Sequence, residues 1–195
     1  FRVRYMFHCE KAEKRREWIM RVHKHFAADI TADGTDTDVA CMPCMFGEVE
    51  ELNTGWAPCY THGKKPGCKN GEVGMCAVTW VHYLVGATSC KDLSRANSTK
   101  QTETCLNAGK KTPGGSNDTF WGMTNYMAEY RPDVVQFENV DEIERTKENG
   151  MSDLDILESE WNARGYDLQK SIVCSTQFGL PQHRGRCMGG VLSSQ

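Results

Sequence analysis

Four polar residues with chemically active side chains each follow a short segment that we expect to form a strand. A thiolate can attack an electron-poor carbon atom, and a carboxyl group can accept or donate a proton. These residue types therefore suit nucleophilic and acid–base chemistry if the fold brings them together. The four residues are Glu10, Asp29, Cys90 and Glu138.

The order of four short segments along the chain is more specific than any of these residues alone. They are Phe7-His8-Cys9-Glu10, Gly86-Ala87-Thr88-Ser89-Cys90-Lys91-Asp92-Leu93-Ser94, Glu138-Asn139-Val140 and Gln182-His183-Arg184-Gly185-Arg186. This order resembles the cytosine-C5 DNA methyltransferase family. In that family the nucleophile lies in a Pro-Cys segment ending in Ser, which is followed by Glu-Asn-Val and by Gln-x-Arg-x-Arg. The resemblance covers nearly the whole chain apart from residues 31–78.

The resemblance implies a catalytic role for Cys90. Its thiolate would attack C6 of a cytosine that has left the duplex, which makes C5 reactive toward a methyl electrophile. Glu138 would hold the base and partly protonate it at N3. Arg186 would contact the base carbonyl, and Arg184 is also assigned to the catalytic group. The substrate-binding residues would be Gln182, Asn139 and Ser94.

The resemblance also implies S-adenosylmethionine as cofactor and DNA as partner. Glu10, after a strand, would accept hydrogen bonds from the two ribose hydroxyls, and Asp29 would accept one from the adenine amino group. The polar stretch 95–118 would be a flap over the site.

Each assignment has a plainer alternative. A cysteine after a strand is often structural, and Glu138 can simply pair with Arg184 on the surface. The segment that contains Gln182 can be a solvated turn. Glu10 precedes a basic helix and can be a carboxylate that the helix dipole favours at an N-terminus.

Four departures from the family pattern favour a second function. A Gly-rich first cofactor motif and a target-recognition domain have no counterpart in these residues, Ser89 replaces the proline before the nucleophile, and residues 31–78 form an insertion. We therefore also consider a non-catalytic, methyltransferase-derived subunit of a larger assembly. Protein partners would then cover an incomplete sheet edge.

The elements that must position these residues alternate along the chain. The apolar patterns predict strands followed by helices. This alternation predicts an α/β fold with a Rossmann-like, doubly wound and mostly parallel sheet, incomplete at its N-terminal strand, with helices on both faces. We expect a single domain over residues 1–195. The expected strands are 1–8, 26–30, 81–86, 133–137, 167–174 and 187–192, and the expected helices are 11–26, 120–130 and 153–164.

Residues 31–78 are rich in cysteine and lack a sustained period, so we expect an irregular insertion. The chain has ten cysteines. Cys41-x-x-Cys44 with Cys59, His62 and Cys68 could bind zinc, but disulfides or buried thiols suit these residues at least as well. The choice between disulfide, thiol and zinc also stays open for Cys76. We therefore assign no metal ligand among the predicted site residues. The compartment stays open: the nucleus for an active enzyme, an oxidising compartment for disulfides.

Composition sets two limits. The net charge of −3 provides no global basic field for nucleic acid, so DNA contact would need a local patch or a partner. No apolar run approaches the roughly 20 residues that span a bilayer.

Overall fold

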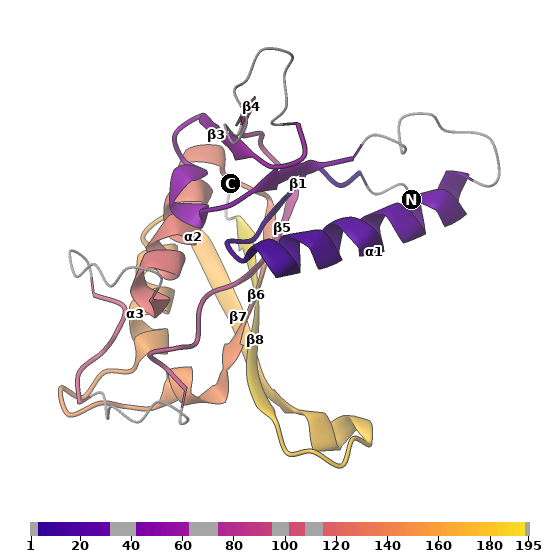
Figure 1. Cartoon of the computed structure of the whole chain (residues 1–195). Coiled ribbons are helices and arrows are strands. Elements are labelled where there is room, and N and C mark those ends of the chain that lie inside the picture. The colour runs from indigo at the N-terminus through magenta and orange to yellow at the C-terminus, as the bar shows by residue number, and fades with distance from the viewer. Residues whose placement is uncertain (1–3, 32–41, 63–73, 95–101, 108–114, 194–195) are drawn as a thin grey trace. The chain divides into compact units, whose positions relative to one another are not determined.

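The computed structural model describes residues 4–31, 42–62, 74–94, 102–107 and 115–193 (Figure 1). The chain divides into two compact units, Phe1–Thr79 and Trp80–Gln195. The described residues form three α-helices and two four-stranded sheets, and both sheets are mixed. The predicted α/β class is confirmed, and the prediction of a single domain over residues 1–195 stays a prediction.

The first unit contains a small sheet with the order β1-β2-β3-β4. Its strands are β1 (Phe7–Cys9), β2 (Cys44–Phe46), β3 (Trp56–Cys59) and β4 (Gly74–Ala77). β1 pairs parallel with β2, whereas β3 runs antiparallel to both β2 and β4. The predicted strand at 1–8 is therefore present in its last part, and residues 1–3 lie outside the described residues.

The helix α1 (Glu13–Thr31) corrects one prediction. We expected a helix over 11–26 and then a strand over 26–30, but the helix continues through this segment. Ala27 and Ala28 are strong helix formers, and no glycine or proline occurs before Thr31 to end the helix. Asp29 consequently lies inside a helix and does not follow a strand.

The stretch 31–78 is more regular than its composition indicated. It contains β2, β3 and β4 as well as a short 3₁₀ helix η2 (Val49–Glu51). Strands of three or four residues are too short to show a period of two in the sequence, so they were missed. Residues 32–41 and 63–73 of this stretch lie outside the described residues.

The second unit contains the sheet β5-β6-β8-β7. Its elements are β5 (Tyr83–Ala87), α2 (Ser116–Tyr130), β6 (Val134–Val140), η3 (Asp141–Glu144), α3 (Asp153–Asn162), β7 (Tyr166–Cys174), η4 (Ser175–Phe178) and β8 (Gly185–Ser193). β5 and β6 are parallel, and β8 is antiparallel to both β6 and β7. Three strands thus run in one direction and β8 runs in the other.

The expected mostly parallel sheet is corrected by the pairing of β7 with β8. The connection between these two strands is short, and a parallel pair would need a crossover of a dozen or more residues. The two strands therefore form a hairpin, and β8 inserts between β6 and β7 with the opposite direction.

The core of the second unit lies on one face of its sheet. Phe137 of β6 packs against Trp161 of α3, with ring centroids 5.5 Å apart, and Phe120 of α2 lies 6.4 Å from the same tryptophan. Trp161 also donates a hydrogen bond to Thr124 Oγ1 at 3.0 Å. Both helices therefore cover the same face (Figure 1), which corrects the prediction of helices on both faces for this unit.

The other face of this sheet presents side chains to solvent, among them Tyr83, Val85 and Leu192. None of the helices in the described part of the chain has the length and apolar character needed to cross a membrane.

Candidate functional site

Cys90 lies in the turn that follows β5. Of the eight cysteines that the structure describes, none is in a disulfide and Cys90 is the one classed as exposed. Cys187 on β8 is buried, and burial raises the pKa of its thiol to about 11. Among the described cysteines of this unit, Cys90 is therefore exposed, Cys174 is half-buried, and Cys105 and Cys187 are buried.

The turn that carries Cys90 is held by the first turn of α2. The backbone N–H of Ser89 donates to Thr119 Oγ1 at 2.8 Å. Asp92 and Ser116 exchange two hydrogen bonds: the Asp92 N–H donates to Ser116 Oγ at 3.1 Å, and the Ser116 N–H donates to Asp92 Oδ2 at 2.7 Å. Gly115 at the N-cap offers no side chain, so Asp92 supplies the acceptor that the helix N-terminus needs.

Asn139 ties the same turn to β6. Its buried side-chain amide donates to Thr88 Oγ1 at 2.7 Å and to the Thr88 carbonyl at 3.3 Å. Its Oδ1 accepts from the N–H of Val140 at 2.7 Å. The residue two positions before Cys90 is therefore fixed to the end of the neighbouring parallel strand.

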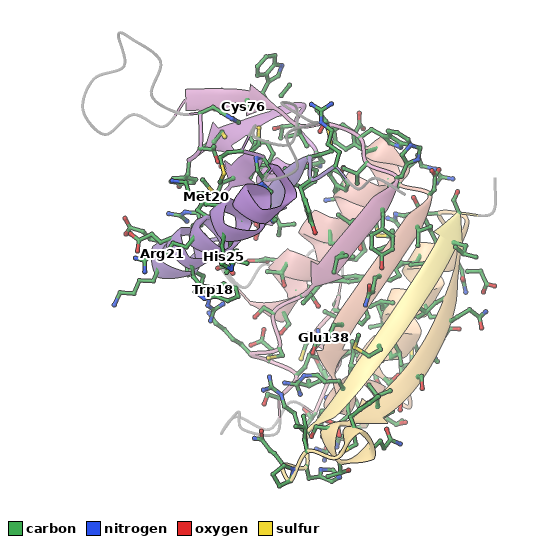
Figure 2. All side chains as sticks on the ribbon, turned by 90° about the vertical axis from the view of Figure 1, so that its right-hand side faces the viewer. Trp18, Met20, Arg21, His25, Cys76 and Glu138 are labelled. Carbon is green, nitrogen blue, oxygen red and sulfur yellow. The ribbon has the colours of Figure 1, made fainter. Side chains whose placement is uncertain are left out.

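Glu138 and Arg186 form an ion pair beside this turn. Arg186 Nε lies 2.6 Å from Glu138 Oε1, and the two side chains keep 23% and 37% of their accessible area. Glu138, marked on β6 in Figure 2, is the register partner of Ala87 across the β5–β6 pair. The Cys90 turn starts directly after Ala87, so this turn and the ion pair lie at the same end of the sheet.

The other predicted residues occupy different positions. Arg184 and Gln182 lie exposed in the connection between β7 and β8, beyond the end of β6. Their backbones bond to Ser175: its Oγ donates to the Gln182 carbonyl and accepts from the Arg184 N–H. Ser94 closes the Cys90 turn, because its N–H donates to the Cys90 carbonyl at 2.9 Å.

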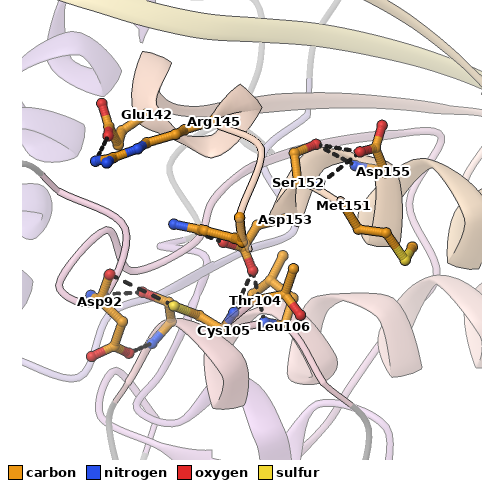
Figure 3. Close-up of polar contacts among 12 residues, drawn as sticks. Asp92, Thr104, Cys105, Leu106, Glu142, Arg145, Met151, Ser152, Asp153 and Asp155 are labelled. Atoms are coloured by element: carbon orange, nitrogen blue, oxygen red, sulfur yellow. Dashed lines mark hydrogen bonds and ion pairs between the residues drawn. The ribbon is translucent and has the colours of Figure 1, made fainter. Parts of the chain in front are cut away.

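Asp153 stabilises a segment that contacts the Cys90 turn, and it was not among the residues predicted from the sequence. Its buried carboxylate accepts from the backbone N–H groups of Cys105 and Leu106, as Figure 3 shows, and lies 3.7 Å from Lys147 Nζ. Burial raises the pKa of Asp153, against the opposing effect of these donors. Cys105 Sγ in turn donates to the Asp92 carbonyl at 3.6 Å.

This contact anchors part of the stretch 95–118 that we expected to form a flap. Residues 102–107 are described, and within them Cys105 and Leu106 are buried. Residues 95–101 and 108–114 lie outside the described residues, and 116–118 already belong to α2.

The two carboxylates predicted to bind the cofactor do not fit one adenosine. Glu10 accepts from the Ala12 N–H at 2.8 Å and lies 3.7 Å from Arg15, so it acts as a helix N-terminal carboxylate. Asp29 lies sixteen residues after Glu13 in the same helix, which corresponds to about 24 Å along the axis. An adenosine group is far too short to reach both residues.

The structure brings together a cysteine–histidine cluster that differs from the predicted set. Its members are Cys44, Cys59, His62 and Cys76. Cys41 and Cys68 lie outside the described residues, and Cys76, for which disulfide, thiol and zinc were left open, joins the cluster. The spacing Cys59-x-x-His62 is common to one half of many zinc sites, and it is the sequence feature that could have predicted this cluster.

Comparison with known proteins bears on the second unit. The family model described as C-5 cytosine-specific DNA methylase matches residues 77–190, which is more than half of the chain. Among solved structures, the chain is similar to the crystal structure of the Dnmt2 methyltransferase of S. pombe, with 19% sequence identity and a TM-score of 0.39. That similarity covers 58% of this chain and 28% of the other. Among curated proteins, none matches.

Proposed function

Because the chain belongs to the C-5 cytosine-specific DNA methylase family, we propose that its second unit methylates cytosine at C5 in DNA, with Cys90 as the nucleophile. The observation that carries this proposal is the exposed Cys90 thiol at the same end of the sheet as the ion pair of Glu138 and Arg186. The family match includes all three residues.

The chemistry needs a nucleophile because C5 of cytosine is unreactive. Addition of the Cys90 sulfur to C6 forms a C–S bond and moves the ring electrons toward C5, which then behaves as an enamine carbon. The bonds from Thr119, Ser116 and Asn139 support this step, because they hold the turn in one position before the base arrives.

Glu138 and Arg186 suit the edge of a cytosine. That edge presents an amino group, the ring nitrogen N3 and a carbonyl oxygen in a row. In our proposal the carboxyl group of Glu138 binds the first two, and the guanidinium of Arg186 donates to the carbonyl. The 2.6 Å contact between Glu138 and Arg186 holds the carboxyl group and the guanidinium side by side. The neighbouring polar groups on the cytosine edge require such an arrangement.

S-adenosylmethionine is proposed as the methyl donor from the family alone. It would supply an electrophilic methyl group to C5. We assign none of the described residues to it, because Glu10 and Asp29 are too far apart.

The first step can be tested without the methyl donor. Once sulfur adds to C6, the hydrogen at C5 can exchange with water, so release of tritium from DNA that contains cytosine tritiated at C5 reports on Cys90 directly. We expect the unaltered chain to release tritium and Cys90→Ala to release only background. Cys174→Ala, which removes a half-buried thiol from the same unit, is the control and should retain full exchange.

Trapping provides a second readout. With S-adenosylmethionine present, the unaltered chain should form a covalent complex with DNA that contains 5-fluorocytosine, and Cys90→Ala should form none. A Cys90→Ala variant that still exchanged tritium or still trapped DNA would refute the assignment.

A second candidate function is a non-catalytic subunit derived from a methyltransferase. The separation of Glu10 and Asp29 favours it, because these two residues then cannot bind one cofactor molecule together as predicted. This function predicts no exchange at C5 and no heat of binding when the purified chain is titrated with S-adenosylmethionine. Tight binding of that cofactor in calorimetry would exclude it.

A further inference from the structure

Three cysteines of the first unit share one face of its small sheet. Cys59 on β3 is the register partner of Gly74, and Cys76 on β4 is the partner of Ala57, so these cysteines are diagonal neighbours. Phe46 on β2 lies opposite Cys59, and Cys44 is two residues before Phe46. Because strand side chains alternate with a period of two, all three sulfurs point to the same side.

His62 completes the group from the turn that follows β3. Its Nδ1 atom lies 3.4 Å from the sulfur of Cys44, 3.5 Å from that of Cys59 and 3.7 Å from that of Cys76. All four candidate ligand atoms lie within 4.8 Å of one another. Figure 2 marks Cys76 on β4 in this unit.

Hydrogen bonds to the His62 Nδ1 atom do not by themselves account for three sulfurs around it. A neutral imidazole nitrogen has either one hydrogen or one lone pair, so Nδ1 can satisfy one sulfur but not three. A disulfide would join two of the sulfurs and leave the third against the ring. No cysteine in the described residues is in a disulfide.

The distances match tetrahedral coordination. Zinc lies about 2.3 Å from thiolate sulfur and about 2.0–2.1 Å from imidazole nitrogen. Two such ligands at a tetrahedral angle are roughly 3.6 Å apart, and the three sulfur–nitrogen distances fall on both sides of that value. Soft sulfur ligands with one imidazole select zinc over magnesium or calcium.

We propose that Cys44, Cys59, His62 and Cys76 bind one zinc ion through three thiolates and the Nδ1 atom of the imidazole. All four ligands precede residue 77, so the site lies outside the part of the chain that the family model matches. It is therefore independent of the proposed methyltransferase function.

The zinc ion in this site is structural. Four protein ligands fill a tetrahedral shell and leave no position for water or substrate. The ion would hold together strands of three or four residues, and such a small sheet has few apolar side chains to bury. Zinc binding then contributes directly to the folding free energy of this unit.

The test begins with the metal content of the whole purified chain. We expect about one tightly bound zinc ion per chain by elemental analysis and native mass spectrometry. Replacement with Co²⁺ should give the intense sulfur-to-cobalt charge-transfer absorption of a thiolate site with tetrahedral geometry. A chain that binds neither Zn²⁺ nor Co²⁺ after reduction overturns the proposal.

Variants then test the ligands. Cys59→Ser and His62→Ala should weaken Zn²⁺ binding by more than the roughly 10- to 100-fold that loss of a hydrogen-bond partner of a ligand costs. His62→Cys replaces one ligand by another and should retain binding, which separates a ligand from a residue that only fills space. Cys9→Ser alters another cysteine of the same unit and serves as the control.

Two results contradict the assignment. One is unchanged zinc affinity in Cys59→Ser and His62→Ala. The other is a disulfide between any two of Cys44, Cys59 and Cys76 in the natural protein, detected by mass spectrometry of peptides from unreduced material. If a variant fails to fold, the cobalt spectrum of the unaltered chain still shows whether sulfur atoms bind the metal.

Discussion

The contact of Glu138 with Arg186 is an ion pair with partial exposure, and such pairs contribute little to stability. Exposed pairs contribute about 0–1 kcal/mol. In our proposal this pair serves to bind the base, and its contribution to folding is small. It also excludes the plainer alternative in which Glu138 pairs with Arg184, because the partner in the structure is Arg186.

We predict that Glu138→Gln lowers C5 exchange by roughly 10²- to 10⁴-fold, the usual contribution of a positioned acid or base. The amide keeps the shape but can no longer act as the acid. Glu158→Gln is a matched control, because Glu158 pairs with Lys170 at 2.7 Å and is 36% exposed. Equal loss of exchange in the two variants would show that Glu138 has no special role.

Asn139 presents a different case because its amide is buried. We predict that Asn139→Ala destabilises the second unit by about 1–3 kcal/mol, since it leaves the polar atoms of Thr88 without their donor. C5 exchange should fall as well, because Thr88 precedes Cys90 by two residues. Urea unfolding combined with the exchange assay measures both effects.

A double-mutant cycle isolates this contact. Thr88→Ala alone should also destabilise the unit, and the combined Asn139→Ala and Thr88→Ala variant should lose less than the sum. Strict additivity of the two losses would show that the 2.7 Å hydrogen bond carries no coupling energy.

Elements in the second unit are joined by polar side chains at their ends as well as by the core. Asp153, in the first turn of α3, binds the segment 102–107, and that segment contacts Asp92 in the Cys90 turn. One buried carboxylate therefore links the segment 102–107 to α3, and this segment adds one contact to those that hold the Cys90 turn.

Replacing Asp153 with Ala should cost about 3–5 kcal/mol, the usual penalty for breaking a buried charged pair. The N–H groups of Cys105 and Leu106 would lose their acceptor, and the buried ammonium of Lys147 would lose its ion-pair partner. Asp153→Asn keeps one acceptor oxygen and should cost less. Asp167→Ala, an exposed aspartate on β7, is the control. A loss below about 1 kcal/mol for Asp153→Ala would contradict this role.

The capping box of α3 provides a prediction for pH. The Ser152 N–H and hydroxyl both donate to Asp155 Oδ2 at 2.7 Å, and the Asp155 N–H donates to Ser152 Oγ at 3.1 Å. The bonds from Ser152 lower the pKa of Asp155. A lowered folded-state pKa contributes stability above the ordinary aspartate value, and this stability is lost as the pH falls through the folded-state pKa.

Ser152→Ala should therefore destabilise the unit by about 1 kcal/mol near neutral pH. The difference between the unaltered chain and Asp155→Asn should shrink once the pH falls below the folded-state pKa of Asp155. Denaturant midpoints at several pH values measure this trend, with Ser159→Ala on the exposed side of α3 as control. A difference that grew on acidification would have the wrong sign for this mechanism.

At the scale of the whole molecule, the chain combines two units with different sources of stability. Trp80–Gln195 has a core of large apolar side chains around Trp161, whereas Phe1–Thr79 has short strands and the proposed zinc ligands. Removal of metal should therefore affect the two units unequally.

We predict that a strong chelator raises deuterium uptake in β2, β3 and β4 while uptake in β6 and β8 stays unchanged. The first unit would lose the binding energy that folds it, and the second would keep its own core. Hydrogen exchange followed by mass spectrometry checks this, and a Cys59→Ser chain should show no further response to chelator. Increased deuterium uptake in both units after chelation would contradict this prediction, because the stability of the second unit would then also depend on the metal.

The sequence by itself determined the elements of the second unit and the family. Its strands and helices were predicted at nearly their observed places, because each carries enough apolar residues to show a period. The segment around Cys90 and the Glu-Asn-Val and Gln-x-Arg-x-Arg segments were singled out from short local motifs, and the family is confirmed by the match over residues 77–190. The catalytic roles of Cys90, Glu138 and Arg186 stay predictions.

Only the tertiary structure decided which distant residues meet. Strand direction depends on pairing partners, so the sequence could not show that β8 lies antiparallel between β6 and β7. The continuation of one helix through Asp29, by contrast, follows from local propensity and was missed in the prediction from sequence. The cluster of Cys44, Cys59, His62 and Cys76 forms because three short strands pair in one register, and register is a property of the folded sheet that no single segment contains.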